Sequence, residues 1–312
     1  MQALANIVLP VFGLLAVGYA ASWARLLPEG AVTGLTTYVF NLAVPLLVFR
    51  TVGAGSLPDV SPWAFWAAYF LGVAGAWGLA SLTARLALGA SLLRAGIGGC
   101  AASYSNTLLL GLPLVLTAFG EAGAIPLFLL LSVHLPLMMV ASILVGEAAG
   151  QGGGDSFAKL ARDTALSVVT NPIIVGIAAG FLWRLGGLEM PVAADKIVNA
   201  IADTAVPCAL IAMGLTLRRY GVGGDLKLTA VIVTAKLVVH PLLVLLAATL
   251  FGLPPVWTGV AVLFAAAPSG ITSYVIASRY NTAVGAVSSA ILIGTGLALF
   301  TNAAVLSIVV VP

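Results

Sequence analysis

SYSNTLLLGLP, residues 103 to 113, contains five consecutive side chains with a hydroxyl or an amide inside a run that is otherwise apolar enough to span a membrane. Gly111 and Pro113 follow, and both residue types weaken an α-helix. A second stretch, AAPSGITSY at residues 266 to 274, repeats this combination around Pro268. Because unpaired backbone groups are costly in hydrocarbon, broken helices at this depth must be buried in protein or line a watery cavity.

The composition indicates that most of this chain is surrounded by lipid and not by water. Hydrophobic residues make up 61% of the 312 residues, and charged residues only 7%. A membrane-spanning helix needs roughly 20 apolar residues. Apolar runs bounded by charges, glycine and proline therefore predict an all-α membrane protein with ten transmembrane helices and no separate soluble domain, the helices lying at about 3–22, 32–50, 63–84, 96–119, 124–146, 165–184, 197–217, 228–251, 257–278 and 284–310.

A Gly-rich linker divides the ten predicted helices into two sets of five. The expected units are a first repeat at 1–148, a cytoplasmic linker at 149–163 and a second repeat at 164–312. Lys and Arg accumulate on cytoplasmic loops. With both termini outside, the inside loops hold nine basic residues, namely Arg25, Arg85, Arg94, Lys159, Arg162, Arg218, Arg219, Lys227 and Arg279. The outside loops hold three, namely Arg50, Arg184 and Lys196. Two five-helix halves must then have inverted topology.

Weak internal similarity supports two inverted five-helix repeats. NLAVP at 41–45 matches DTAVP at 203–207 at an offset of 162 residues, and Gly111 matches Gly270 at an offset of 159. The two polar interruptions then occupy corresponding positions, in the fourth and the ninth helix. Paired helix breaks of this kind indicate a binding site near the bilayer midplane.

The chemistry of these breaks favours an anionic ligand. A half-helix N-terminus offers free N–H groups and a partial positive charge, which suit a carboxylate. Isolated Ser, Thr and Asn residues are ordinary contacts between membrane helices, but here they are clustered, joined to helix breakers and repeated. The predicted substrate-binding residues are Asn41, Ser105, Asn106, Thr107, Ser269, Gly270, Thr272, Ser273 and Tyr274, with Gly111, Pro113 and Pro268 as the helix-breaking residues.

Ionisable residues inside the predicted helices have two interpretations. Asp203 and Lys236 lie on the seventh and eighth helices, where a charge is expensive and usually faces the protein interior. Asp203 is either a carboxylate that couples transport to a proton or cation, or the structural partner of Lys236. His134 and His240 precede prolines and are interpreted as hydrogen-bonding residues between helices.

Three stretches carry a family resemblance: SNTLLLGLPLV at 105–115, AAAPSGITSYVIASRYN at 265–281 and NLAVPLLVF at 41–49. They resemble the auxin efflux carrier family, which includes plant PIN proteins and bacterial carriers of small organic acids. The resemblance covers essentially the whole chain. It implies a ten-helix, two-repeat fold in the bacterial inner membrane, with broken, crossing fourth and ninth helices and a transport bundle that moves against a scaffold.

Two departures from the plant pattern concern the breaks themselves. Ser105 stands where the plant carriers have a proline, so the first break is expected to be softer than the second, which keeps Pro268. Ser269 stands where they have a glutamine, which puts an aromatic, auxin-like substrate in doubt.

The leading functional prediction is a secondary transporter of a small organic anion, such as an auxin-like acid, malate or malonate, with elevator-type alternating access. The alternative is a cation/proton antiporter of similar broken-helix architecture, which would need carboxylates at the crossing. Neither enzyme chemistry nor a nucleic-acid partner is indicated. Cys100 and Cys208 lack metal-ligand spacing, and neither a metal nor a cofactor is expected. Substrate identity, the coupling ion and the assembly, including a homodimer, stay open.

Overall fold

The computed structural model describes residues 2–28, 30–54, 60–150, 162, 165–166 and 168–309. Within these residues the regular secondary structure is helical, and one isolated β-bridge joins Ser105 to Ser269. Seven of the described helical stretches are long and apolar enough to cross a membrane. The all-α membrane character is thus confirmed. Most of the predicted linker at 149–163 lies outside the described residues.

The helices follow the predicted apolar runs. In the first half they are α1 Gln2–Trp23, α2 Gly30–Tyr38, η1 Val39–Ala43, α3 Val44–Ala54, α4 Pro62–Leu88, α5 Leu92–Ser103, η2 Thr107–Gly111, α6 Leu112–Phe119, η3 Gly120–Gly123 and α7 Ala124–Ala148. In the second half they are α9 Pro172–Leu185, α10 Val192–Ala202, α11 Ala205–Leu217, α12 Leu226–Thr234, η4 Ala235–Val239, α13 His240–Leu250, α14 Pro255–Ala266, α15 Ile271–Arg279 and α16 Val284–Val309.

Both predicted interruptions are present. The run predicted at 96–119 breaks between α5 and η2, and the run at 257–278 breaks between α14 and α15. In the second break, Ala267 has the extended ψ of 141° that suits a residue before proline. The first break lacks a proline, yet Tyr104 has a similarly extended ψ of 102°.

Prolines also explain a feature that the sequence analysis missed. The turns η1, η2 and η4 are π-helical, and each ends two residues before a proline, at Pro45, Pro113 and Pro241 respectively. Proline has no N–H for the carbonyl four residues earlier, and its ring crowds that carbonyl. A π-turn shifts hydrogen bonding to the carbonyl five residues back, so the helix continues past the proline. Lys236 lies on one of these wide turns, η4.

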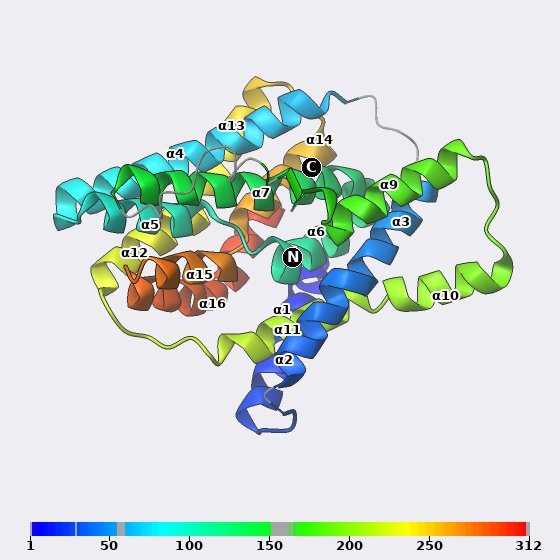
Figure 1. Ribbon diagram of the computed structural model, residues 1–312, viewed down its shortest axis with the longest axis horizontal. Coiled ribbons are helices and arrows are strands. Elements are labelled where there is room, and N and C mark those ends of the chain that lie inside the picture. The colour runs from blue at the N-terminus through cyan, green and yellow to red at the C-terminus, as the bar shows by residue number, and fades with distance from the viewer. Residues whose placement is uncertain are drawn as a thin grey trace.

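The helices pack as two groups, which Figure 1 shows side by side. In the small group α1 packs against α11, and α3 packs against α9 and α10. In the large group α4 packs against α5 and α13, and α14 packs against α13 and α16. Contacts of α11 with η2 and of α7 with α3 join the groups. The two breaks therefore lie within the large group, next to α11 of the small group.

Glycines allow the backbones of the small group to approach closely. A Cβ atom added to Gly18 of α1 would meet the backbone of Ile211, and one added to Gly214 of α11 would meet the carbonyl of Leu15. Small residues at helix contacts are the usual means of close packing in membranes. The contact between α1 and α11 depends on these two glycines.

Gly18→Val should therefore destabilise the protein, because the neighbouring backbone cannot move aside as a side chain could. Overpacking of this kind costs about 1–3 kcal/mol, which should be measurable as earlier thermal unfolding in detergent. Gly13→Val on the same helix is the matched control, since a Cβ atom at Gly13 meets no atom within 4 Å. Equal stability of the two variants would contradict this view of the contact.

Candidate functional site

The two helix breaks cross and pair through their backbones. The N–H of Asn106 donates to the carbonyl of Pro268 at 2.8 Å, and the N–H of Gly270 donates to the carbonyl of Tyr104 at 2.7 Å. This antiparallel pair of bonds is the bridge between Ser105 and Ser269. Each break thus supplies the hydrogen-bond partners that the other one lacks.

Gly270 is required by the closeness of this crossing. A Cβ atom at Gly270 would lie 2.8 Å from the carbonyl oxygen of Ser105 and 3.1 Å from the ring of Tyr104. Both are part of the opposing break, so neither can move without disturbing the backbone pair. The side chains at the crossing are buried: Ser105 and Ser269 are each 1% exposed and Asn106 is 5% exposed.

Four half-helix ends meet at the crossing. The carboxyl ends belong to α5 and α14, and the amino ends belong to η2 and α15. Side chains from other helices satisfy the carboxyl ends: the hydroxyl of Ser269 donates to the carbonyl of Ala101 at 2.7 Å, and the amine of Lys236 donates to the carbonyl of Ala265 at 2.5 Å. The first N–H groups of each amino end have no acceptor within their own helix.

Most of the predicted site residues are brought together here. Ser105, Asn106, Pro268, Ser269 and Gly270 form the crossing itself. The remaining residues of this set lie in the first turns beyond it, namely Thr107, Gly111, Pro113, Thr272 and Ser273. The hydroxyl of Ser273 donates to the carbonyl of Gly270 at 2.6 Å and so supports the break.

Asn41 and Tyr274 lie apart from this cluster. Asn41 is exposed on η1, which packs mainly against helices of the small group, including α9 and α11. Tyr274 turns its ring edge towards Tyr220, with ring centroids 5.1 Å apart. Successive residues of a helix point in different directions, so Tyr274 is only half-buried although its neighbour Ser273 is buried. The apolar run in the sequence does not show which of them faces the crossing.

Of the two interpretations of Asp203, the structural pair with Lys236 is wrong. Asp203 lies at the end of α10, where its carboxylate accepts from Arg50 at 2.8 Å, and its side chain is 67% exposed. Lys236 is 1% exposed, and no carboxylate of the described residues lies within ion-pair distance of it. The expectation failed because helices that follow one another in sequence need not pack together: α10 packs against α3 in the small group, whereas η4 packs against α4, α5 and α14 in the large group.

Lys236 instead contacts the crossing directly. Its nitrogen lies 2.9 Å from the hydroxyl of Ser105 and 3.0 Å from Nδ1 of His240, in addition to the carbonyl of Ala265. Lys236 and His240 are four residues apart across η4 and the start of α13, a spacing that places side chains on the same helix face. This spacing was the available sequence signal for the contact.

A second buried contact extends this network. The hydroxyl of Tyr69 on α4 lies 3.2 Å from Nδ1 of His134 on α7 and 3.5 Å from the hydroxyl of Ser105. All three side chains are buried. The histidines were expected to bond between helices; His134 does so, whereas His240 bonds to Lys236 within the same predicted span. Nothing in the sequence pointed to Tyr69, because an aromatic residue in an apolar run usually indicates packing.

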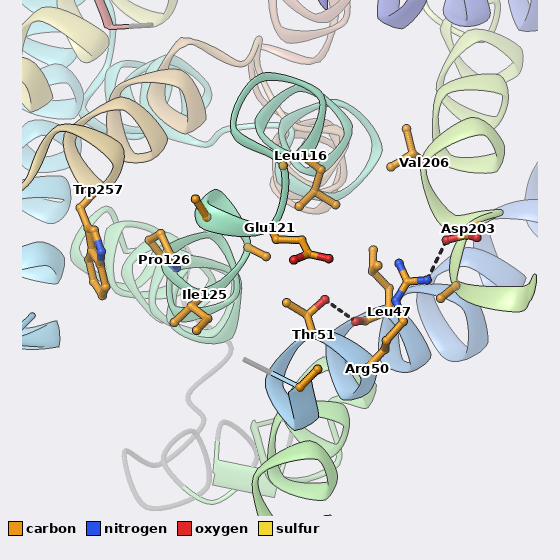
Figure 2. A pocket seen from close by; sticks show the side chains of 15 residues that line it. Leu47, Arg50, Thr51, Leu116, Glu121, Ile125, Pro126, Asp203, Val206 and Trp257 are labelled. Atoms are coloured by element: carbon orange, nitrogen blue, oxygen red, sulfur yellow. Dashed lines mark hydrogen bonds and ion pairs between the residues drawn. The ribbon is translucent and has the colours of Figure 1, made fainter. Parts of the chain in front are cut away.

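A cavity of about 840 Å³ lies between the two helix groups (Figure 2), and its lining does not include the residues of the crossing. Arg50 and Asp203 lie on its small-group wall, and Glu121 and Trp257 lie on its large-group wall. Val206 of α11 also lines it. Two helical turns further along α11, the thioether of Met213 accepts a 3.0 Å hydrogen bond from the amide of Asn106. Val206 and Met213 share a face of α11, so this face runs from the cavity to the crossing.

Comparisons with known proteins agree with this architecture. The family model described as membrane transport protein matches residues 4–306. A putative malonate transporter of Rhizobium meliloti (strain 1021) is 31% identical over 96% of this chain and 94% of its own length. Auxin efflux carrier component 1 of Arabidopsis thaliana is 28% identical over 42% of this chain and 22% of its own length. The lysosomal cholesterol signaling protein of Mus musculus is 27% identical over 75% of this chain and 28% of its own length.

Paired broken helices that meet inside an all-helical membrane protein are typical of secondary transporters. The chain belongs to the membrane transport protein family that includes the auxin efflux carriers. The resemblance noted from the sequence is thereby confirmed.

The new partner of Asp203 changes the expected effect of removing its charge. Because the pair with Arg50 is partly exposed, Asp203→Asn should cost less than about 1 kcal/mol of stability. Lys236→Met should cost clearly more, since it leaves the buried Ser105 hydroxyl, the Ala265 carbonyl and His240 without a donor. Thermal unfolding of both variants in detergent tests this, and a larger loss for Asp203→Asn would refute the assignment.

Proposed function

We propose that the protein is a secondary transporter of a small organic anion, which binds at the crossing of the two broken helices. The observation that carries this proposal is the meeting of two half-helix amino ends with the buried amine of Lys236, where the described residues contribute no carboxylate. Amino ends carry partial positive charge and free N–H groups. A carboxylate supplies the complementary charge and acceptors.

The cation/proton antiporter is the competing function and is less well supported. A cation at the crossing would need carboxylate or carbonyl oxygens, and one carbonyl at the crossing, that of Ala265, already accepts from Lys236. Asp203 is engaged with Arg50 beside the cavity. The printed name of the Rhizobium relative, a putative malonate transporter, also favours a small carboxylate. Malonate is therefore the first substrate to test, followed by malate and an aromatic acid.

Elevator-type alternating access is our proposed mechanism. The division into a small and a large helix group supports it, because both breaks and Lys236 belong to the large group. The contact of Asn106 with Met213 crosses from one group to the other. A thioether is a weak acceptor, so a substrate carboxylate can replace it at Asn106 when the groups shift. The cavity beside Arg50 is the proposed approach to the crossing.

Ten spanning helices in two inverted repeats remain our proposed topology, and the packing supports it. The contact of α1 with α11 has a counterpart in that of α9 with α3, as expected if the first and sixth helices are equivalent. The contacts of α4 with α5 and of α13 with α14 correspond in the same way. The basic residues further favour both termini outside the bacterial inner membrane.

Asn106→Ala tests the site. A hydrogen bond to a charged group contributes about 1.5–3 kcal/mol, so we expect the affinity for malonate to fall on the order of ten-fold or more. Binding to the purified variant by calorimetry and uptake into proteoliposomes are the two measurements. Thr83→Ala is a control, because this exposed hydroxyl bonds only to Leu79 within its own helix. Unchanged carboxylate binding in a folded Asn106→Ala variant would remove the crossing as the substrate site.

A cysteine at Gly152 tests the topology. In a background without Cys100 and Cys208, it should resist an impermeant thiol reagent in intact cells, because the linker is proposed to be cytoplasmic. A cysteine at Glu189, an exposed residue between α9 and α10, should react, because this turn is proposed to be external. The opposite labelling pattern would invert the proposed orientation.

A further inference from the structure

Lys236 and His240 form a pair of basic groups at full burial. Their nitrogens lie 3.0 Å apart, and the two residues are 1% and 0% exposed. Two positive charges at this distance and depth would repel strongly, with no carboxylate of the described residues to balance them. The pair can therefore hold one positive charge or none. In either case a hydrogen bond joins the two nitrogens, so both states are compatible with the observed geometry.

The groups around this pair offer no other charge. Tyr69 faces it from α4, with its ring centroid 5.7 Å from that of His240, and His134 from α7 contacts Tyr69. Tyr104 follows α5 and packs edge-on against His134. The neighbouring helices α14 and α16 contain no ionisable residue. Any change of charge at the crossing therefore falls on the pair, on its neighbours Tyr69, Tyr104 and His134, or on the buried thiol of Cys100 on α5, which bonds to Ser142.

The pair is connected both to the crossing and to unused hydrogen-bonding capacity. Lys236 donates to Ser105, the residue next to Asn106. On the other side, Nε2 of His240 is buried without a hydrogen-bond partner in the described part of the chain, as is Nε2 of His134. Buried polar atoms are normally satisfied, and unsatisfied ones in a functional region indicate a group whose protonation or contacts change.

We infer that the Lys236–His240 pair is the proton site of the transporter and that one proton is carried with each anion. This inference rests on the proposed anion transport. The amine of Lys236 takes a proton from water on the side from which the anion enters, forming an N–H bond and an ammonium. The ammonium balances the anion at the crossing through Ser105. After the site reaches the other side, the anion leaves and the ammonium returns its proton to water there.

Wild-type protein in proteoliposomes gives the first test, with labelled malonate as the probe and the membrane potential held at zero by potassium and valinomycin. With an alkaline interior, one coupled proton allows accumulation of about ten-fold for each pH unit of gradient. A pH dye inside the vesicles should report acidification that needs both protein and malonate. The quantity compared between variants is the ratio of gradient-driven accumulation to malonate exchange without a gradient.

Lys236→Arg gives the second test, because a guanidinium keeps its charge and cannot release the proton. We expect its accumulation ratio to fall to the value without a gradient, whatever its absolute exchange rate. Lys227→Arg, which changes an exposed lysine at the start of α12, is the matched control and should keep the wild-type ratio. If Lys236→Arg does not fold, His240→Phe replaces it as the test variant, because it removes the partner that shares the proton. Its accumulation ratio is then judged together with the dye measurement on the wild-type protein.

The outcomes separate this inference from the proposed function. Wild-type exchange of malonate without accumulation or acidification would overturn the proton site but leave anion transport intact. Accumulation that persists in Lys236→Arg would show that the substrate itself carries the proton, which also overturns the inference. Failure of wild-type protein to bind or exchange any carboxylate of the panel would overturn both.

Discussion

The structure depends on the backbone pairing between two interrupted helices. In hydrocarbon, the free N–H and carbonyl groups of a single broken helix would be unsatisfied. Here the N–H groups of Asn106 and Gly270 find acceptors on the opposite break, at Pro268 and Tyr104. Neither interruption is tolerable without the other. This mutual dependence explains why the crossing is fully buried, and why Gly270 has no room for a side chain.

The same constraint explains the polar residues behind the crossing. The carboxyl ends of α5 and α14 also leave carbonyl groups without helical partners. Ser269 and Lys236 satisfy one carbonyl at each end. A lysine is well suited to the second position, because a positive group beside a helix carboxyl end opposes the negative end of the helix dipole. The amine also reaches Ser105, so a single side chain ties a structural cap to the proposed binding site.

In the proposed mechanism, the crossing moves relative to the small group at the boundary between the two helix groups. The crossing is built from the large group alone, whereas Asn106 reaches across to Met213 of the small group. In the proposed elevator mechanism, the backbone bonds within the large group would let it shift as one body. The weak thioether contact at its boundary would then be exchanged for a substrate carboxylate. The close glycine contacts of α1 with α11 and of α3 with α9 fit the scaffold role that the proposed mechanism gives to the small group.

The amino-acid sequence by itself determined the solvent, the apolar helices and the positions of both interruptions, because hydrocarbon imposes apolar runs and proline and clustered polar residues mark where they fail. It also indicated Ser105, Asn106, Ser269 and Gly270 as one cluster, through the correspondence between the halves. Only the tertiary structure decided which side chains bond to one another. Lys236 bonds to Ser105 and His240 while Asp203 bonds to Arg50, since helix rotation and long-range packing fix which side chains face each other. The extended first break without a proline has the same origin, because the opposing strand of backbone at Pro268 imposes it.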